Sequence, residues 1–278
     1  MKYAFNTWAY GSFPTWLPSY TLDETIRRLA QIGYQGIEIG CAAPHAWPAY
    51  LSSERRKEVR KLAEGEGAPI TSLLPAPGGG PGCNAASPDP AERAFAASHY
   101  REVIDLAFDL GAKTVLYVAG WQIFGTSRKQ AWAWSAECLA GIAGHAAKKG
   151  ITIAVEPTPA DSNLVESIDD AIEMIDQVGA SNLRVMFDTF HSMYRNEIAA
   201  DYVHVAGKRL GNVHCADVGR RAPAPGPIDW HGLLQALKDV GYDGYVTMEY
   251  GFASRAADPD ELARRGLAYL KKIEAGLQ

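Results

Sequence analysis

Cysteine is scarce in this 278-residue sequence, and its four copies are far apart. Cys41, Cys83, Cys138 and Cys215 are separated from one another by at least 42 residues. A structural zinc site would need Cys-x-x-Cys spacing, and a disulfide framework would need a dense set of cysteines. We therefore expect a protein of a reducing, cytoplasmic compartment whose fold depends on its apolar core.

Long apolar runs and an excess of basic residues are also missing. A membrane-spanning helix needs about 20 consecutive apolar residues, whereas runs such as residues 115–119 end after a few positions. The stretch Met1–Asn6 becomes polar too early for a secretory signal. Duplex-binding proteins carry a basic face, but here 27 Lys and Arg stand against 32 Asp and Glu, a net charge of -5. We expect a small-molecule partner, with no nucleic acid and no membrane.

Short apolar runs alternate with longer amphipathic segments along the whole chain. Near-continuous apolar runs are typical of strands buried on both faces of a parallel sheet. Helix boundaries lie between them, since Thr21 and Glu24 have capping-box spacing before a helix that ends near Gly33, and a helix from Ser167 ends at Gly179. The eight predicted strands are residues 3–8, 36–40, 70–74, 114–120, 151–157, 183–189, 210–217 and 245–250.

This alternation predicts an α/β fold built from βαβ units. Eight strands and eight helices favour a single (β/α)8 TIM barrel over residues 1–278, a usual length for one such barrel. A doubly wound open sheet is the alternative, but no Gly-x-Gly-x-x-Gly motif follows the first strand. The glycine-rich residues 78–82 are not followed by Lys-Ser/Thr, so we interpret them as a loop and not as a phosphate-binding motif.

Four side chains that can bind a metal lie at the ends of four consecutive predicted strands. They are Glu156, Asp188, His214 and Glu249. The active site of a TIM barrel lies at the carboxyl ends of its strands, so these groups would converge. Three carboxylates cannot converge in a dry site without a compensating cation. Oxygen ligands with one imidazole suit Mn²⁺, Mg²⁺ or Co²⁺, and we expect Mn²⁺.

With these residues the chain resembles the xylose-isomerase-like sugar isomerase/epimerase superfamily, and within it the ketose 3-epimerases that act on D-tagatose, D-psicose or L-ribulose. The resemblance is carried by residues 156–157, 187–191, 212–217 and 244–249. It implies the same metal set and a homodimer or homotetramer. It also implies that His191, three residues after one ligand, and Arg220, six after another, bind the substrate.

One position departs from that subfamily. The ketose epimerases carry a second glutamate six residues after the first Glu ligand, near the first carbons of the sugar, and Ser162 stands there in this chain. The metal set is unaffected by this change. The identity of the sugar is left open, and so is a substrate other than a free ketohexose.

An epimerase must remove a proton from the carbon beside a ketone and return one to the opposite face. Glu156 and Glu249 would flank the metal and act as base and acid, through a metal-stabilised enediolate. Trp121, directly after the fourth predicted strand, is the preferred apolar contact for the sugar. Asn6 at the end of the first strand is a further candidate substrate contact, with weaker grounds for Glu38 and His45. The other tryptophans near strand ends are Trp8, Trp16 and Trp47.

Other functions remain possible on the same scaffold. A lyase or dehydratase for a keto-sugar or inosose would use the same metal and Glu base. An endonuclease IV-like enzyme shares the barrel, but it would need three metals, more histidine ligands and a basic face. Here His99, His145, His204 and His231 lie in or near predicted helices, where we expect structural roles. A barrel that binds sugar without turnover is the non-enzymatic alternative.

Overall fold

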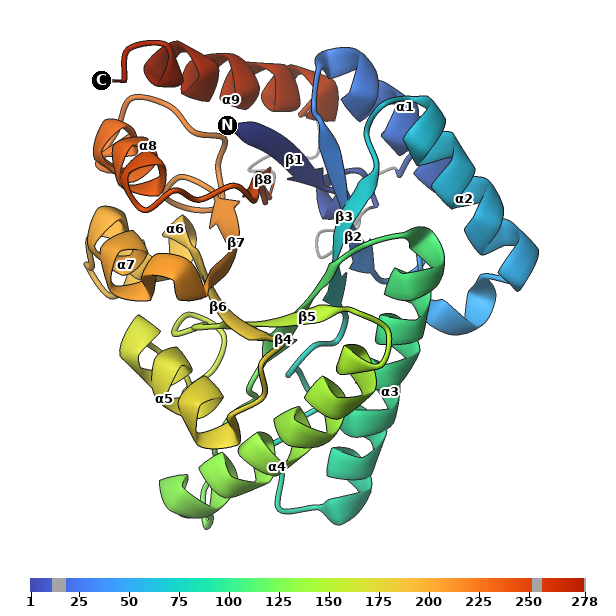
Figure 1. Ribbon diagram of the computed structural model, residues 1–278, viewed down its shortest axis with the longest axis vertical. Helices are drawn as coiled ribbons and strands as arrows, with labels where there is room; N and C mark the ends of the chain where they lie inside the picture. Colours follow the sequence, from blue (N-terminus) through green and yellow to red (C-terminus); the bar gives the residue numbers. More distant parts are fainter. Residues whose placement is uncertain (12–18, 252–256, 278) are drawn as a thin grey trace.

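Eight parallel strands close into a barrel in chain order, with β8 beside β1 (Figure 1). The computed structural model describes residues 1–11, 19–251 and 257–277. The predicted (β/α)8 barrel is confirmed, although six strands end one or two residues earlier than predicted because the chain turns out of the sheet there. The strands are β1 Lys2–Asn6, β2 Gly36–Cys41, β3 Ile70–Pro75, β4 Thr114–Val118, β5 Thr152–Glu156, β6 Leu183–Asp188, β7 Leu210–Cys215 and β8 Tyr245–Met248.

Helices surround the barrel as an outer ring (Figure 1). The connection from β6 to β7 holds two helices, α6 and α7, where one was predicted. No helix in the described ranges combines the length and apolar character needed to cross a membrane. The α-helices are α1 Leu22–Ile32, α2 Ser53–Gly65, α3 Pro90–Leu110, α4 Arg128–Ala147, α5 Ile168–Val178, α6 Thr189–Tyr194, α7 Ala199–Ala206, α8 Trp230–Asp239 and α9 Pro259–Glu274, and the 3₁₀ helices are η1 Thr7–Tyr10, η2 Pro48–Tyr50 and η3 Gly207–Arg209.

Local signals in the sequence set the helix ends. The Thr21 hydroxyl accepts a hydrogen bond from the Glu24 N–H at the start of α1. At the start of α5, Ser167 and Asp170 form a full capping box. Gly33 ends α1 in the left-handed region at φ 105°, where a side chain would be strained. The predicted boundaries of α1 are thus confirmed by cap geometry.

Side chains along the strands alternate between two environments. Outward-facing residues, including Cys215 of β7, pack in the main core beneath the helices. Inside the barrel, β3 to β6 contribute a small separate apolar cluster: Leu74, Leu116, Ala154 and Met186. The interior on the side of β1, β2 and β7 is mostly polar instead, and its buried side chains include Asn6, Glu38, Asn212 and His214. Half of the barrel interior is therefore built for packing, and the other half carries buried hydrogen-bonding groups.

Candidate metal and active site

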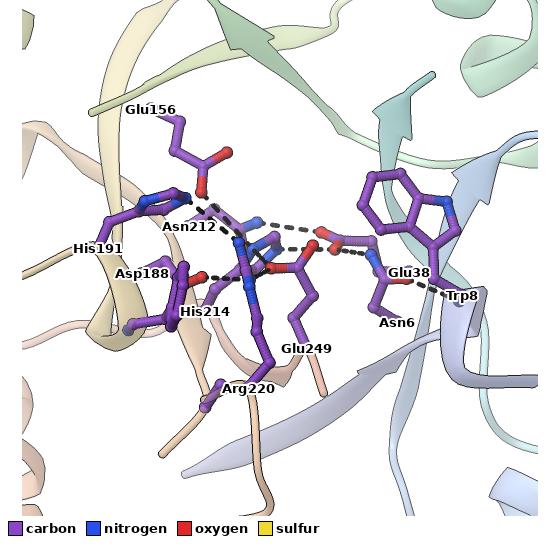
Figure 2. A network of polar contacts seen from close by, with 12 residues as sticks. Asn6, Trp8, Glu38, Glu156, Asp188, His191, Asn212, His214, Arg220 and Glu249 are labelled. Carbon is purple, nitrogen blue, oxygen red and sulfur yellow. Dashed lines mark hydrogen bonds and ion pairs between the residues drawn. The ribbon is translucent and has the colours of Figure 1, made fainter. Parts of the chain in front are cut away.

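The strand ends bring the four predicted metal ligands into one buried cluster (Figure 2). Glu156 ends β5 and Asp188 ends β6, whereas Glu249 follows β8. His214 lies in β7 directly beside Asp188 in the strand register. None of the four residues is more than 5% exposed.

The cluster has the geometry of a cation site. Ligand atoms of Asp188, His214 and Glu249 lie within 4.8 Å of one another, and so do those of Glu156, Asp188 and His191. Both ring nitrogens of His214 are buried, and neither makes a hydrogen bond of good geometry with the described residues. Nδ1 is the nitrogen on the side of the carboxylate cluster. That nitrogen lies 3.3 Å from Oε2 of Glu249 and 3.9 Å from Oε1 of Glu156. A buried imidazole nitrogen that faces two carboxylates fits a divalent cation bound between them.

Arg220 supplies positive charge to this cluster from the loop after β7. Its Nη1 lies 2.6 Å from Oδ2 of Asp188 and also donates to Glu249. Its Nη2 lies 3.3 Å from Nε2 of His191, and its guanidinium carbon lies 4.3 Å from the centre of the Phe190 ring. The backbone of Arg220 has φ 59°, an uncommon conformation for a residue other than glycine.

Burial and like charge shift the pKa values of the clustered groups. Burial raises the pKa of Glu156 well above its usual range; His214 partly offsets this, and the other two carboxylates add to it. Burial also raises the pKa of Asp188. For Glu249 the effect of burial is outweighed by Arg220 and His214, so its pKa is lowered. Burial lowers the pKa of His191 to about 4. These opposed shifts show that the carboxylates depend on nearby positive charge to stay ionised.

The loop after β5 shows how the Ser162 departure is accommodated. Oγ of Ser162 lies 2.7 Å from the Thr158 hydroxyl and donates to the Thr158 carbonyl oxygen, so this side chain is bonded within its own loop. The preceding residue, Asp161, places Oδ2 3.5 Å from Nε2 of His191 and 3.8 Å from Nη2 of Arg220. Sequence reasoning did not single out Asp161. Its carboxylate, 65% exposed, lies beside the two predicted substrate-binding residues.

Asn6 and Trp8 lie on the opposite side of the cluster, next to Glu38 (Figure 2). The side-chain amide of Asn6 makes both contacts. Its Nδ2 donates to Oε1 of Glu38 at 2.8 Å, and its Oδ1 accepts from the backbone N–H of Trp8 at 2.8 Å. The Trp8 side chain packs against the apolar cluster inside the barrel. At Gly40 an added Cβ would overlap the Trp8 indole, so only glycine leaves room for this ring. Trp8 therefore forms an apolar wall beside the polar cluster.

The other aromatic candidates are less directly placed. Trp121 is half-buried three residues beyond β4, and Asn84 binds both its N–H, at 3.1 Å, and its carbonyl oxygen, at 2.9 Å. Its contact with substrate stays a prediction. Trp47 stacks on His99 with ring centres 5.0 Å apart, and Trp16 lies outside the described residues.

The remaining histidines have the structural or solvent-facing positions expected of them. Nε2 of His99 lies 3.0 Å from the Ala76 carbonyl oxygen, and Nε2 of His145 lies 2.7 Å from Asp105. His204 and His231 are exposed on helices. His45, a weaker candidate for the site, contacts the Tyr20 carbonyl oxygen at 2.8 Å.

A TIM barrel whose strand ends carry three carboxylates and a histidine belongs to a recognisable class. The chain matches the family described as "Xylose isomerase-like TIM barrel" over residues 26–273. The protein is a member of that family, as its resemblance implied.

Its relatives narrow the comparison further. The chain is 30% identical to the D-psicose 3-epimerase of Ruminiclostridium cellulolyticum over 233 residues, 81% of this chain and 76% of that one. It is 24% identical to the 3-dehydro-D-guloside 4-epimerase of Escherichia coli K12 over 262 residues, 89% of this chain and 93% of that one. A crystal structure of D-psicose 3-epimerase in the presence of D-fructose shares its fold, with a TM-score of 0.85, 23% identity and coverage of 98% and 99% of the two chains.

Proposed function

We propose that this protein is a divalent-metal-dependent sugar epimerase, and specifically a ketose 3-epimerase. The observation that carries the proposal is the approach of two glutamates, Glu156 from β5 and Glu249 from β8, to the same buried nitrogen of His214. Relatives named as epimerases of D-psicose and of 3-dehydro-D-guloside support it. Glu156, Asp188, His214 and Glu249 would hold the metal, which we propose to be Mn²⁺, with Mg²⁺ or Co²⁺ as alternatives.

The two glutamates account for the proton transfers. Inverting the carbon beside a ketone requires a base on one face and an acid on the other, within hydrogen-bond reach of the carbon's proton. Glu156 and Glu249 come from strands on different sides of β6 and β7, so a sugar bound between them exposes one face to each. A bound divalent ion would stabilise negative charge on the sugar oxygens as a Lewis acid.

Substrate orientation is assigned to residues at the rim of the cluster. His191 and Arg220 would bind the carbonyl end of the sugar, since the guanidinium and the imidazole lie 3.3 Å apart and both face the carboxylates. Asn6 and Trp121 complete the proposed contacts. The Trp8 indole offers an apolar face for the carbon skeleton, because sugar C–H groups pack on aromatic rings.

The assembly and location of the protein are proposals as well. The family resemblance suggests a homodimer or homotetramer, and the wide spacing of the cysteines suggests the cytoplasm. The partner is a small keto-sugar and not a nucleic acid or a membrane.

One observation favours a second candidate, a lyase or dehydratase acting on a keto-sugar or inosose. Ser162 is bonded to Thr158 and offers no carboxylate at the position where the ketose epimerases carry glutamate. The same metal and base could then expel a leaving group in place of reprotonating the carbon.

Proton exchange in D₂O separates these functions. The purified protein is loaded with Mn²⁺ and incubated with each substrate in turn. The substrates are D-fructose, D-psicose, D-tagatose, L-ribulose, a 3-keto-glucoside and a keto-inositol. The products are analysed by NMR after the metal is removed. We expect deuterium at C3 of at least one ketose together with its epimer. Loss of water or of the aglycone would assign a lyase, and binding without deuterium incorporation would assign a non-catalytic barrel.

A further inference from the structure

We propose that Glu38 is a positioning residue that holds the His214 imidazole with Nδ1 directed at the metal. The inference rests on the proposed metal site and adds a residue beneath it. Glu38 belongs to β2, is fully buried, and is a carboxylate within an otherwise apolar run, Ile37–Ile39. Its Oε1 lies 2.7 Å from Nε2 of His214 (Figure 2).

The Glu38 carboxylate is surrounded by donors on both oxygens. Oε1 accepts from the Asn6 amide at 2.8 Å in addition to contacting His214. Oε2 accepts from the Ser72 hydroxyl at 2.6 Å and from the Asn212 amide at 3.1 Å. Asn6 and Ser72 flank Glu38 in the register of β1, β2 and β3. The acceptor positions of both oxygens are thus occupied, which restrains the carboxylate against rotation.

This arrangement determines which nitrogen of His214 is available to a cation. Both ring nitrogens face carboxylates, but Nε2 lies closer to Glu38, at 2.7 Å, than Nδ1 lies to Glu249, at 3.3 Å. When a cation takes Nδ1, the one hydrogen of the neutral imidazole lies on Nε2, where Glu38 can accept it. Nδ1 then carries the lone pair, and it is Nδ1 that faces Glu249 and Glu156. A carboxylate behind a metal-binding histidine fixes its orientation and increases its basicity as a ligand.

A role in packing alone does not account for Glu38. The same barrel interior is filled on the side of β3 to β6 by Leu74, Leu116, Ala154 and Met186, so aliphatic side chains suffice there. A buried carboxylate is costly unless it is fully bonded. On the side of β7, by contrast, Glu38 contacts Nε2 of His214, the ring nitrogen that points away from the proposed cation.

The variant Glu38→Gln tests the inference, with Mn²⁺ alone as the probe. The amide keeps the shape and one acceptor oxygen, but its NH2 group must face either Asn6 and His214 or Ser72 and Asn212. We expect the Mn²⁺ dissociation constant, measured by calorimetry, to rise about 10- to 100-fold. In the Mg²⁺-loaded protein, ¹⁵N NMR should show His214 with its hydrogen on Nε2 in the wild type and a mixture of tautomers in the variant. Circular dichroism monitors the fold.

Asp260→Asn is the matched control. Asp260 is also a largely buried carboxylate, bonded to Tyr10 at 2.8 Å and Arg28 at 2.9 Å, but it lies on α9 in the outer ring. Its substitution can lower stability and should leave Mn²⁺ affinity within twofold of the wild type. A loss of affinity in Glu38→Gln without one in Asp260→Asn separates positioning of His214 from a general effect of losing a buried charge.

Two results would overturn the inference in distinguishable ways. If the wild type binds Mn²⁺ and Glu38→Gln binds it equally well with the same tautomer, Glu38 has no positioning role and the metal site stands. If the wild type binds no divalent ion, the metal site and the role of Glu38 are both wrong. Should Glu38→Gln not fold, Ser72→Ala removes one donor from Oε2, and an affinity loss under threefold would contradict the inference.

Discussion

Nη1 of Arg220 lies 2.6 Å from Oδ2 of Asp188 and pairs with Glu249 as well. One guanidinium therefore provides positive charge to two of the carboxylates that we propose as metal ligands. The Gly251 N–H donates to the Arg220 carbonyl oxygen at 2.7 Å and helps hold the left-handed backbone that aims this side chain inward. Such a backbone costs about 1–3 kcal/mol and persists where surrounding structure enforces it.

The first prediction concerns the two glutamates. Glu156→Gln and Glu249→Gln should each reduce deuterium exchange into a ketose by at least about 10²- to 10⁴-fold, the range for losing a general acid or base. Glu156 is a buried carboxylate repelled by its neighbours, so the metal-free melting temperature should not fall in Glu156→Gln. Glu249→Gln also loses the ion pair with Arg220, so its metal-free melting temperature should fall. NMR in D₂O and thermal unfolding measure the two effects.

Glu64→Gln is the control for that prediction. Glu64 pairs with Arg60 at 2.8 Å on the exposed face of α2, so its loss should leave exchange at the wild-type rate. Wild-type exchange in either Glu156→Gln or Glu249→Gln would contradict the proposed chemistry.

A second prediction follows from the position of Arg220. Arg220→Ala removes a charged hydrogen-bond donor to substrate, a loss of about 1.5–3 kcal/mol that corresponds to a KM increase of roughly 10- to 100-fold. The same change removes a guanidinium that competes with Mn²⁺ for the carboxylates of Asp188 and Glu249, so Mn²⁺ should bind more tightly. Steady-state kinetics and calorimetry report these opposite changes, and a parallel loss of both affinities would show that Arg220 supports the metal site instead.

A third prediction uses the contact between Gly40 and Trp8. Gly40→Ala forces the indole out of its place, and overpacking of this kind costs about 1–3 kcal/mol. If the indole forms the sugar-binding wall, KM should rise while Mn²⁺ affinity is unchanged. Gly65→Ala is the matched change, because nothing lies within 4 Å of a Cβ added there. An unchanged KM in Gly40→Ala would exclude the Trp8 face from substrate binding.

A fourth prediction concerns the pH dependence of stability. Burial lowers the pKa of His99 below its ordinary value of 6.5, so the folded state binds a proton less readily than the unfolded state. The stabilisation from neutral His99 is complete above pH 6.5 and is lost as the pH falls below that value. In urea unfolding, His99→Gln should lessen the drop in stability between pH 7.5 and 5.5 by up to about 1 kcal/mol.

The exposed His231 provides the comparison for that measurement. His231→Gln should show the same drop in stability as the wild type. If His99→Gln shows the same drop in stability as the wild type, the acid sensitivity arises from other groups. The next group to test is His45, which is also buried and whose pKa burial also lowers.

The barrel could be predicted because its signal is local. Apolar runs of strand length, separated by capped helices, are legible along the chain, and all eight strands formed where expected. The ends were less accurate, since apolar residues such as Ala119 and Ala216 continue beyond the last residue of β4 and of β7, where the backbone has already left the sheet. The pair of short helices between β6 and β7 was also missed, because together they have the length of one.

The gathering of Glu156, Asp188, His214 and Glu249 could be predicted too, because equivalent strand ends meet at one edge of a closed barrel. The partners of these residues could not. Asp161 approaches His191 and Arg220 through the path of an irregular loop, for which the sequence has no periodic signal. Trp8 was one of several tryptophans near strand ends, and its place depends on the space left by Gly40.

The sequence by itself determined the order of strands and helices, the face on which each strand residue lies, and the acidic and imidazole groups at the strand ends. Local periodicity and capping chemistry are enough for that. Only the tertiary structure decided that Glu38 of β2 meets His214 of β7, a contact made across the interior of the barrel. Barrel closure and strand register set such pairings, because they bring together residues that no short-range pattern connects.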